Sequence, residues 1–496
     1  MKKVYVVILS ILLALCVALF AACSYSGDYY ERFPNASGSA NENYRYETVV
    51  EQDFVSTDDE TDSYFSLDRN TASYSLMRRQ IEAGRKLSAG SVRLEECVNY
   101  FNYSYARPTG DDALALSGSV FDCPWNTDHL LLSIAVAAEE LKIEDTARNN
   151  IVFLIDTSGS MYGDDRLGLI QQAFIMLLDN LHSDDVISVV TYAGDSRVAL
   201  DGEPAENKIK IAKVIEDLQA YGSTNGAGGL DSAYRIAEKH FIEDGNNRVI
   251  LATDGDFNVG VSSRNGLERL IKEKRQGSGI YLSVLGVGMT NTNDSIMETL
   301  ARNGDGNYAY LDSVFEAKKA LVDEINGTLV TVAKDAKIGV KFNRDVVSKY
   351  RLLGYDTKLL TEEQFEDEKT DAGEIGSGHT VTAVYEIELR TFVGLERQGE
   401  IATAEVRYKK AATNENKSVS VTFDTDDYTA VPSDDCMFIG CVLEYGLVLR
   451  ESKYKGNASI NSVLSRLEGL TGYVSADVFK QDFVRIVRLA SELYNS

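Results

Sequence analysis

The chain is short of histidine, and this shortage excludes a class of function. Only four histidines occur in 496 residues, and none of them shows a zinc-binding spacing such as His-Glu-x-x-His. The sequence also lacks Gly-x-Ser-x-Gly, the nucleophile elbow of many serine hydrolases. The common hydrolase signatures are therefore missing. We interpret the histidines as structural residues: His129, His182, His240 and His379.

Basic residues are also few. The 50 lysines and arginines face 76 aspartates and glutamates, which gives a formal net charge of −26. Nucleic acids and anionic lipids are bound by clustered basic side chains, so the composition argues against both as partners. Such acidity is typical of a protein kept soluble in a salty exterior. It leaves an acidic ligand free to approach a metal ion, because exposed charges are screened beyond about 10 Å.

The N-terminus has the pattern of a secretory signal peptide. Two lysines precede an apolar stretch, Val4–Ala22, and small residues end it. The stretch is also long enough for a retained membrane anchor. The exit favours the signal peptide, because Phe20-Ala21-Ala22-Cys23 resembles a bacterial lipobox with Phe20 in the place of the usual leucine. We therefore expect Cys23 to be lipidated and the protein to be anchored in the bacterial envelope, outside the cytoplasmic membrane, at the cell surface or in the periplasm.

The composition changes several times along the mature chain. Residues after Cys23 are polar and acidic, which is typical of a disordered tether. Structured patterns begin near residue 63 and change character near residues 149, 333 and 426. The predicted order is a signal peptide (1–22), a tether (23–62), an N-terminal flank (63–148), a central domain (149–332), a β-rich region (333–425) and a helical tail (426–496).

Four cysteines remain in the predicted folded part. An exported chain permits disulfides, and the sequence alone leaves this open. Cys97 and Cys441 lie in apolar surroundings, which favours buried, reduced thiols in the core. The full set is Cys97, Cys123, Cys436 and Cys441.

Strands alternate with helices in the central domain. Apolar runs such as Ile151–Ile155, Val186–Tyr192 and Arg248–Ala252 are separated by segments with helical periodicity, such as Leu167–Leu181. This order predicts an α/β fold with a Rossmann-like, parallel-dominated sheet that helices cover on both faces.

The flanks of the central domain are rich in strands. Leu114–Phe121 and Leu130–Ala138 precede the domain, and Lys337–Phe342, Val381–Leu389 and Ala402–Tyr408 follow it. We expect the two flanks to form one β-rich sandwich from which the central domain protrudes. Helices are predicted for the C-terminus.

Polar side chains follow two of the central strands. Asp156, Ser158 and Ser160 come directly after one strand, Asp254 comes after another, and Thr224 lies in a glycine-rich segment between them. Because ligands bind where the carboxyl ends of parallel strands meet, we expect these five side chains to lie together. Two carboxylates and three hydroxyls suit a hard cation such as Mg²⁺. The alternative is that they are turn residues that cap helices.

These segments resemble the metal-ion-dependent adhesion site of the von Willebrand factor type A (vWA) domain. The resemblance implies that both serines bind Mg²⁺ (or Mn²⁺ or Ca²⁺) directly, that Asp156 and Asp254 often act through water, and that Thr224 does either. It also implies an open coordination position for a partner's carboxylate. In some relatives the final helix of the domain shifts between two states, and here that helix is expected at Phe315–Leu329.

Both flanks resemble a bacterial subgroup of vWA proteins, the YfbK-like set. The resemblance is carried by Ser66–Trp125, by Tyr350–Tyr355 and by Asp371–His379, and it extends over roughly residues 64–490.

Two further groups of residues near the site have simpler interpretations. Asp164 and Asp165 are candidates for a second ion, but acidic residues are also favoured at a helix N-terminus. Gly226, Gly228 and Gly229 do not form a dinucleotide fingerprint. We expect them to let the Thr224 segment pass close to the ion.

The sequence therefore predicts a binding protein and not an enzyme. The partner would be a protein that offers an exposed acidic side chain to the bound ion. The alternatives are a structural subunit of an envelope complex and a metal-dependent hydrolase. The oligomeric state is left open.

Overall fold

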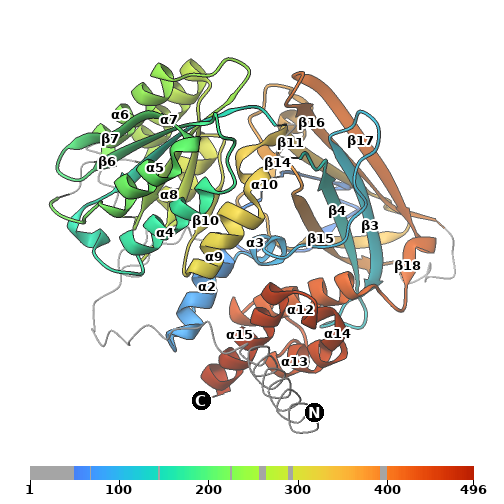
Figure 1. Cartoon of the computed structure of the whole chain (residues 1–496). Helices are drawn as coiled ribbons and strands as arrows, with labels where there is room; N and C mark the ends of the chain where they lie inside the picture. The colour runs from blue at the N-terminus through green and yellow to red at the C-terminus, as the bar shows by residue number, and fades with distance from the viewer. Residues whose placement is uncertain are drawn as a thin grey trace, which may run out of the picture. The chain divides into compact units, whose positions relative to one another are not determined.

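The central domain is an α/β layer around one six-stranded sheet (Figure 1). The computed structural model describes residues 50–67, 69–142, 146–223, 226–255, 264–288, 294–390 and 399–495. The strand order is β10-β9-β8-β5-β6-β7, and only β7 runs antiparallel to its neighbour. The strands are β5 (Asn149–Asp156), β6 (Val186–Tyr192), β7 (Ser196–Pro204), β8 (Asn246–Thr253), β9 (Tyr281–Gly286) and β10 (Tyr308–Tyr310).

Helices cover both faces of this sheet, as predicted. On one face, Ile151 and Phe153 of β5 pack with α4, α5 and the last helical segments. On the other face, Val152 and Leu154 pack with α6, α7 and α8. The helices are α4 (Leu167–Leu178), α5 (Lys208–Glu216), α6 (Gly226–Lys239), α7 (Arg264–Ser278), α8 (Asp294–Asn303), α9 (Val314–Lys318) and α10 (Ile325–Leu329).

Two more sheets form the β-rich part, and each contains strands from both sides of the central domain. In the first sheet β4 pairs with β15, and in the second β2 pairs with β11. The first sheet is β1 (Val55–Ser56), β12 (Val347–Leu352), β15 (Thr380–Leu389), β4 (Leu130–Ala138), β3 (Leu114–Asp122) and β18 (Tyr428–Thr429). The second is β13 (Leu359–Leu360), β2 (Asp62–Ser66), β11 (Thr331–Phe342), β16 (Glu400–Lys410) and β17 (Glu415–Asp424), with β14 (Gly373–Gly376) also paired to β11.

The apolar sides of these two sheets share one core. Leu132 and Ile134 of β4 pack in the same cluster as Ile338 and Val340 of β11. The prediction that the flanks form one sandwich is therefore confirmed, and the central domain is an insertion between β4 and β11.

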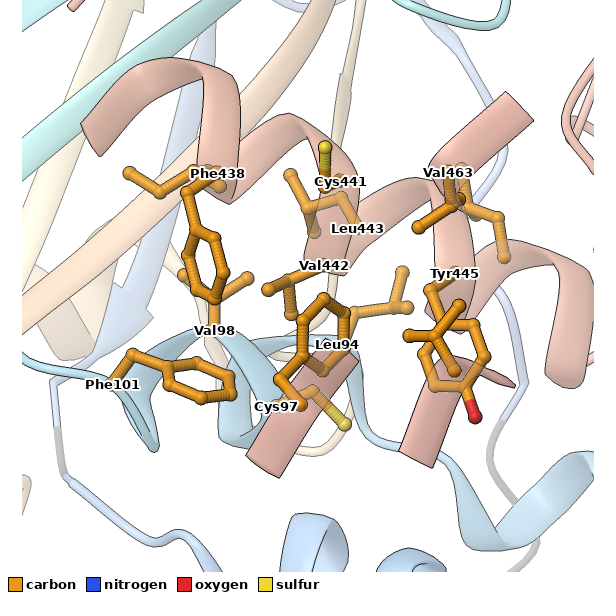
Figure 2. Packing of buried hydrophobic residues seen from close by; sticks show 14 of the residues in the cluster. Leu94, Cys97, Val98, Phe101, Phe438, Cys441, Val442, Leu443, Tyr445 and Val463 are labelled. Carbon is orange, nitrogen blue, oxygen red and sulfur yellow. The ribbon is translucent and has the colours of Figure 1, made fainter. Parts of the chain in front are cut away.

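The C-terminal helices pack on two helices of the N-terminal flank. Figure 2 shows Leu94 and Val98 of α3 facing Val442 and Tyr445 of α12 in a wholly buried apolar cluster. The four cysteines belong to this cluster, and burial raises the pKa of the Cys441 thiol to about 12. The helices are α2 (Ala72–Glu82), α3 (Leu94–Asn99), α12 (Asp434–Leu449), α13 (Ile460–Gly469), α14 (Thr471–Ser475) and α15 (Val478–Asn495), and α11 (Glu362–Glu366) lies in the β-rich part.

The predicted tether ends too late in the sequence. Strand β1 pairs with β12 through Val55 and Tyr350, and Glu51 lies 3.2 Å from Arg351. A polar segment can still form an edge strand, because the pairing uses backbone groups. A tether can thus occupy only residues before 50, which lie outside the described residues together with Cys23 and the signal peptide. Within the described ranges, no helix has the length and apolar character needed to cross a membrane.

The final helix of the central domain is interrupted, whereas one continuous helix is predicted for Phe315–Leu329. A π-helical turn, η5 (Lys319–Asp323), separates α9 from α10. The Glu324 N–H donates to the Lys319 carbonyl five residues earlier, and the two side chains form an ion pair at 2.6 Å. The wider turn places residues i and i+5 on one side of the segment, where both meet the N-terminal flank.

Buried arginines of the N-terminal flank join it to the central domain. Each arginine meets a carboxylate that lies on or beside α8, α9 or α10. The arginine side chains are at most 4% exposed, so these pairs are shielded from water. The pairs are Arg69–Glu324, Arg78–Asp312 and Arg93–Asp294, at 2.7, 2.6 and 2.8 Å.

His379 is buried at the junction between α10 and the β-rich part. A Cβ on Gly327 would lie 1.9 Å from its Nε2 atom, and within the described part of the chain neither ring nitrogen has a hydrogen-bond partner. Burial, together with the nearby Arg69 cation, lowers the pKa of His379 to about 3. The imidazole is therefore neutral in the folded protein.

We expect His379 to make the fold acid-sensitive. The unfolded histidine takes up a proton near pH 6.5, whereas the folded one does not until about pH 3. The contribution of His379 to the free energy of unfolding is thus fully present above pH 6.5. Below that pH it falls by about 1.4 kcal/mol per pH unit. Urea unfolding at pH 7, 6 and 5 measures this slope. In the variant His379→Gln the free energy of unfolding should fall less steeply with pH, by the uptake of one proton. Equal slopes in the two proteins would contradict a neutral, buried His379.

Candidate metal centre

Asp156 ends strand β5 in the middle of the central sheet. Its neighbours are β6 and β8, so the carboxyl ends of three parallel strands meet around it. The side chain is fully buried. Its Oδ1 accepts the Ser158 N–H at 2.9 Å, and its Oδ2 accepts hydroxyl protons from Tyr192 at 3.1 Å and Thr253 at 3.2 Å. The carboxylate therefore fixes the following loop and both adjacent strand ends.

Ser158 and Ser160 present their hydroxyl groups side by side. A 3₁₀ turn over Gly159–Met161 follows Ser158, and the two Oγ atoms are 3.1 Å apart. Two adjacent ligands of an octahedral Mg²⁺ ion, each at about 2.1 Å, lie about 3.0 Å apart. The loop is thus already arranged so that both hydroxyls can share one small ion.

Two backbone contacts hold this loop against the segment before Thr224. The Gly159 N–H donates to the Gly222 carbonyl at 3.1 Å, and the Tyr221 N–H donates to the Thr157 carbonyl at 2.7 Å. Thr224 itself lies outside the described residues. The segment that leads to it is therefore placed at the loop, while the position of the Thr224 hydroxyl remains a prediction.

Asp254 supplies a second carboxylate from the end of β8. It is 2% exposed and directly follows Thr253, whose hydroxyl contacts Asp156. Burial, together with the negative charge of Asp254, raises the pKa of Asp156 to about 6. Two carboxylates in a dry site repel each other unless a cation or a proton lies between them.

The side chains around the candidate centre have structural roles that the sequence did not reveal. The Arg166 Nη1 donates to the Ser160 carbonyl at 2.7 Å. Tyr192 ends β6 next to Asp156, and its position at a carboxyl strand end is a signal that the sequence does contain. Gly229 lies in α6, and a Cβ there would come within 2.8 Å of the Tyr192 ring. The predicted role of Gly229, to shape the Thr224 segment, is therefore wrong. Gly229 instead allows α6 to pack closely on the end of β6.

Asp165 pairs with Arg79 of α2 at 3.2 Å, which accounts for this residue without a second ion. Asp164 is exposed beside it. One acidic group elsewhere in the described chain, His182, Asp184 and Asp185, brings three ligand atoms within 4.8 Å of one another. It lies before β6, at the opposite edge of the sheet, and Asp185 there accepts two hydrogen bonds from Asn149. We interpret this group as a structural cap.

The donor set at the carboxyl edge fits a divalent cation. Asp156, Ser158, Ser160 and Asp254 offer oxygen atoms only, which Mg²⁺ prefers. Both carboxylates are buried, and the raised pKa of Asp156 shows that its charge is poorly compensated by the protein. A bound cation would supply the missing positive charge.

Comparison with known proteins agrees with this geometry. Family models match at residues 150–325 (von Willebrand factor type A domain), 40–133 (von Willebrand factor) and 327–493 (uncharacterized protein YfbK, C-terminal). The chain is 37% identical over 448 residues to the protein YfbK of Escherichia coli, covering 86% of this chain and 77% of that protein. It is 32% identical over 212 residues to protein sll0103 of Synechocystis, covering 42% of this chain and 48% of that protein.

Similarity to animal proteins is confined to a smaller part. The chain is 30% identical over 165 residues to the inter-alpha-trypsin inhibitor heavy chain H3 of Bos taurus, covering 32% of this chain and 18% of that protein.

A solved structure of a von Willebrand factor type A protein from Catenulispora acidiphila is similar at a TM-score of 0.44 and 15% identity, covering 76% of this chain and 89% of that one.

The central domain is thus a vWA domain, a class that commonly mediates protein–protein interactions and commonly binds a divalent cation. The chain as a whole belongs to the YfbK family of vWA proteins. The resemblance predicted from the sequence is confirmed for both the domain and the flanks.

Proposed function

We propose that the protein is a metal-dependent binding protein of the bacterial envelope. It would hold one Mg²⁺ ion with Ser158, Ser160, Asp156, Asp254 and Thr224, and would capture a protein partner through an acidic side chain that completes the coordination of the ion. The observation that carries the proposal is the pair of serine hydroxyls at 3.1 Å beside two buried carboxylates.

The hydrogen bonds of Asp156 support a division of roles among these residues. Its two oxygens already accept three protein hydrogen bonds. It would therefore act on the ion through water, while the serine hydroxyls would bind directly. The ion would supply the positive charge that attracts the partner's carboxylate, and the loop would keep one coordination position free for it.

The proposal includes the envelope location and favours binding over catalysis. The pattern of residues 1–23 would export the chain and anchor it by a lipid on Cys23. Binding is favoured because the sequence carries none of the common hydrolase signatures, neither a zinc-binding histidine spacing nor a nucleophile elbow. A purely structural role in an envelope complex is the competing function, and it differs in needing no exchangeable partner at the ion.

Metal uptake tests the site. We expect calorimetry to detect one Mg²⁺ ion per chain, and the melting temperature to fall when EDTA removes it, because a ligand of the native state stabilises by mass action. The double variant Ser158→Ala/Ser160→Ala should lose both effects. Asp184→Asn, in the acidic group at the opposite edge, is the matched control and should keep them. If only the control lost Mg²⁺ uptake, the ion would instead be bound by the acidic group around Asp184.

Partner capture tests the function. The lipid-free chain, immobilised, should retain an envelope protein in Mg²⁺ and release it in EDTA, and the double serine variant should retain none. Retention that is equal with metal, with EDTA and with the variant would favour the structural role. Metal-dependent turnover of an ester or phosphate by the wild type alone would instead favour a hydrolase.

A further inference from the structure

Two exposed tyrosines stand beside the candidate metal centre. Tyr162 is 80% exposed and Tyr221 is 63% exposed, although large aromatic side chains are usually at least partly covered. Both emerge from the segments that form the site. Tyr162 follows the 3₁₀ turn of the serine loop, and Tyr221 precedes Gly222, whose carbonyl accepts the Gly159 N–H.

The backbone fixes these two tyrosines close to the serine hydroxyls. The Tyr162 N–H donates to the Gly159 carbonyl at 3.3 Å, and the Tyr221 N–H donates to the Thr157 carbonyl at 2.7 Å. Each tyrosine is therefore bonded to a residue that adjoins Ser158. The backbones of both tyrosines are therefore fixed next to the loop that would hold the ion.

The charges exposed around the tyrosines are mainly acidic. Asp164 is exposed two residues after Tyr162. Asp195 is exposed in the turn between β6 and β7, which touches the Tyr221 segment because the Ser223 Oγ lies 3.1 Å from the position of a Cβ on Gly194. Arg197 adds one exposed cation. The chain as a whole carries a net charge of −26.

These observations specify the chemistry of a partner. The faces of tyrosine rings attract lysine and arginine side chains, and exposed acidic groups favour a basic surface. The ion, in contrast, requires an anion. Both demands are met by an acidic side chain that has basic side chains next to it in the same exposed segment.

We propose that Tyr162 and Tyr221 form the contact rim of the site, and that the partner segment carries an aspartate or glutamate with lysine or arginine within about two positions. This inference rests on the proposed function, because the acidic residue is placed by the ion. Tyrosine is among the residues that dominate binding energy at protein interfaces. Removal of either ring should therefore weaken binding strongly while leaving metal uptake intact.

A phage-displayed library of random 12-residue peptides provides the probe. The chain is immobilised in Mg²⁺, bound phage are eluted with EDTA, and enriched peptides are synthesised for affinity measurement. We expect enriched sequences to contain an acidic residue with lysine or arginine within two positions. Their affinity should fall at least tenfold for Tyr162→Ser or Tyr221→Ser, and by less than threefold for the corresponding phenylalanine variants, which keep the ring.

Phe241→Ser serves as the matched control. Phe241 is 48% exposed just after the end of α6, on the edge of the sheet away from the candidate centre, so its loss should leave peptide affinity unchanged. Acidic peptides without basic neighbours would overturn the partner class. The contact role of Tyr162 and Tyr221 would be contradicted if peptides bound the wild type and the serine variants equally. It would also be contradicted if a chain that takes up Mg²⁺ enriched no peptides that EDTA releases. A chain that takes up no Mg²⁺ would instead overturn the proposed function.

Discussion

Replacement of Arg78 by methionine should destabilise the folded protein by about 3–5 kcal/mol, because it leaves buried charges without a partner. Arg78 lies 2.6 Å from both Asp312 and Glu316 and 3.4 Å from Asp482, and all four side chains are at most 4% exposed. Its Nη1 also donates to the Tyr100 hydroxyl at 2.8 Å. The Arg78 guanidinium therefore compensates Asp312 and Glu316 of the central domain, and it shares Asp482 of α15 with Arg485.

The loss should be smaller in acid than at neutral pH. Burial raises the pKa of Glu316 above its ordinary value even with Arg78 beside it. In Arg78→Met the native carboxylates would bind protons more readily than the unfolded ones, so the stability of the variant relative to wild type should rise as the pH falls from 7 to 5. Urea unfolding at both pH values measures this recovery.

Arg390→Met is the control for the Arg78 experiment. Arg390 pairs with Asp58 at 2.6 Å, but the two side chains are 32% and 58% exposed. Exposed pairs contribute about 0–1 kcal/mol, so the same chemical change should cost little there. If Arg78→Met costs no more than Arg390→Met, the buried cluster does not hold the central domain to its flanks.

This cluster also bears on the final helix of the domain. Phe315 of α9 packs on Phe479 of α15 with ring centroids 4.5 Å apart, and Lys319 and Glu324 meet Arg69 of the flank. A shift of α9 and α10 would have to break these contacts together. In this chain the contacts with the flanks therefore restrain α9 and α10.

The sequence predicted the fold where periodicity was strong. Val186–Tyr192 is a strand with the predicted bounds, and the pairing of flank strands followed from their position on both sides of one α/β unit. It missed β7, because Ser196–Pro204 mixes polar and apolar residues at an exposed edge. It also missed the π turn at Lys319, because one extra residue in a helical turn leaves no clear pattern in the sequence.

The candidate site was predictable to the same degree. Asp156, Ser158, Ser160 and Asp254 could be found because strand ends converge in a parallel sheet, and the structure brings their segments together. Tyr192 could have been found in the same way, because it also ends a parallel strand, whereas Arg166 could not, because its role depends on side-chain direction. The three buried arginines were equally hidden, since a sequence does not show which charges will lose contact with water.

Replacement of Asp156 by asparagine should abolish Mg²⁺ uptake and, at the same time, stabilise the metal-free protein by about 3 kcal/mol. The carboxylate has a raised pKa of about 6 in a buried site next to Asp254. Each unit of displacement from the ordinary value represents about 1.4 kcal/mol against the charged form. Asparagine keeps an oxygen for the Ser158 N–H and removes the charge.

The sign of the pH dependence follows from the same displacement. The native Asp156 binds a proton below about pH 6, whereas the unfolded residue does so only near pH 4. The stability of the metal-free wild type should therefore rise relative to Asp156→Asn as the pH falls from 7 to 4. Thermal melts in EDTA at pH 7, 6, 5 and 4 measure this difference.

Adding Mg²⁺ should reverse the order of the two proteins. The ion supplies the positive charge that Asp156 and Asp254 lack, so the wild type gains stability by mass action and the variant gains none. The helix-capping interpretation predicts no such reversal, because asparagine caps a helix about as well as aspartate does and a cap does not respond to Mg²⁺. Two proteins that melt together in EDTA and in Mg²⁺ would therefore identify Asp156 as a turn residue. A variant that melts above the wild type in EDTA and below it in Mg²⁺ would identify a carboxylate that binds a cation and lowers the stability of the metal-free protein.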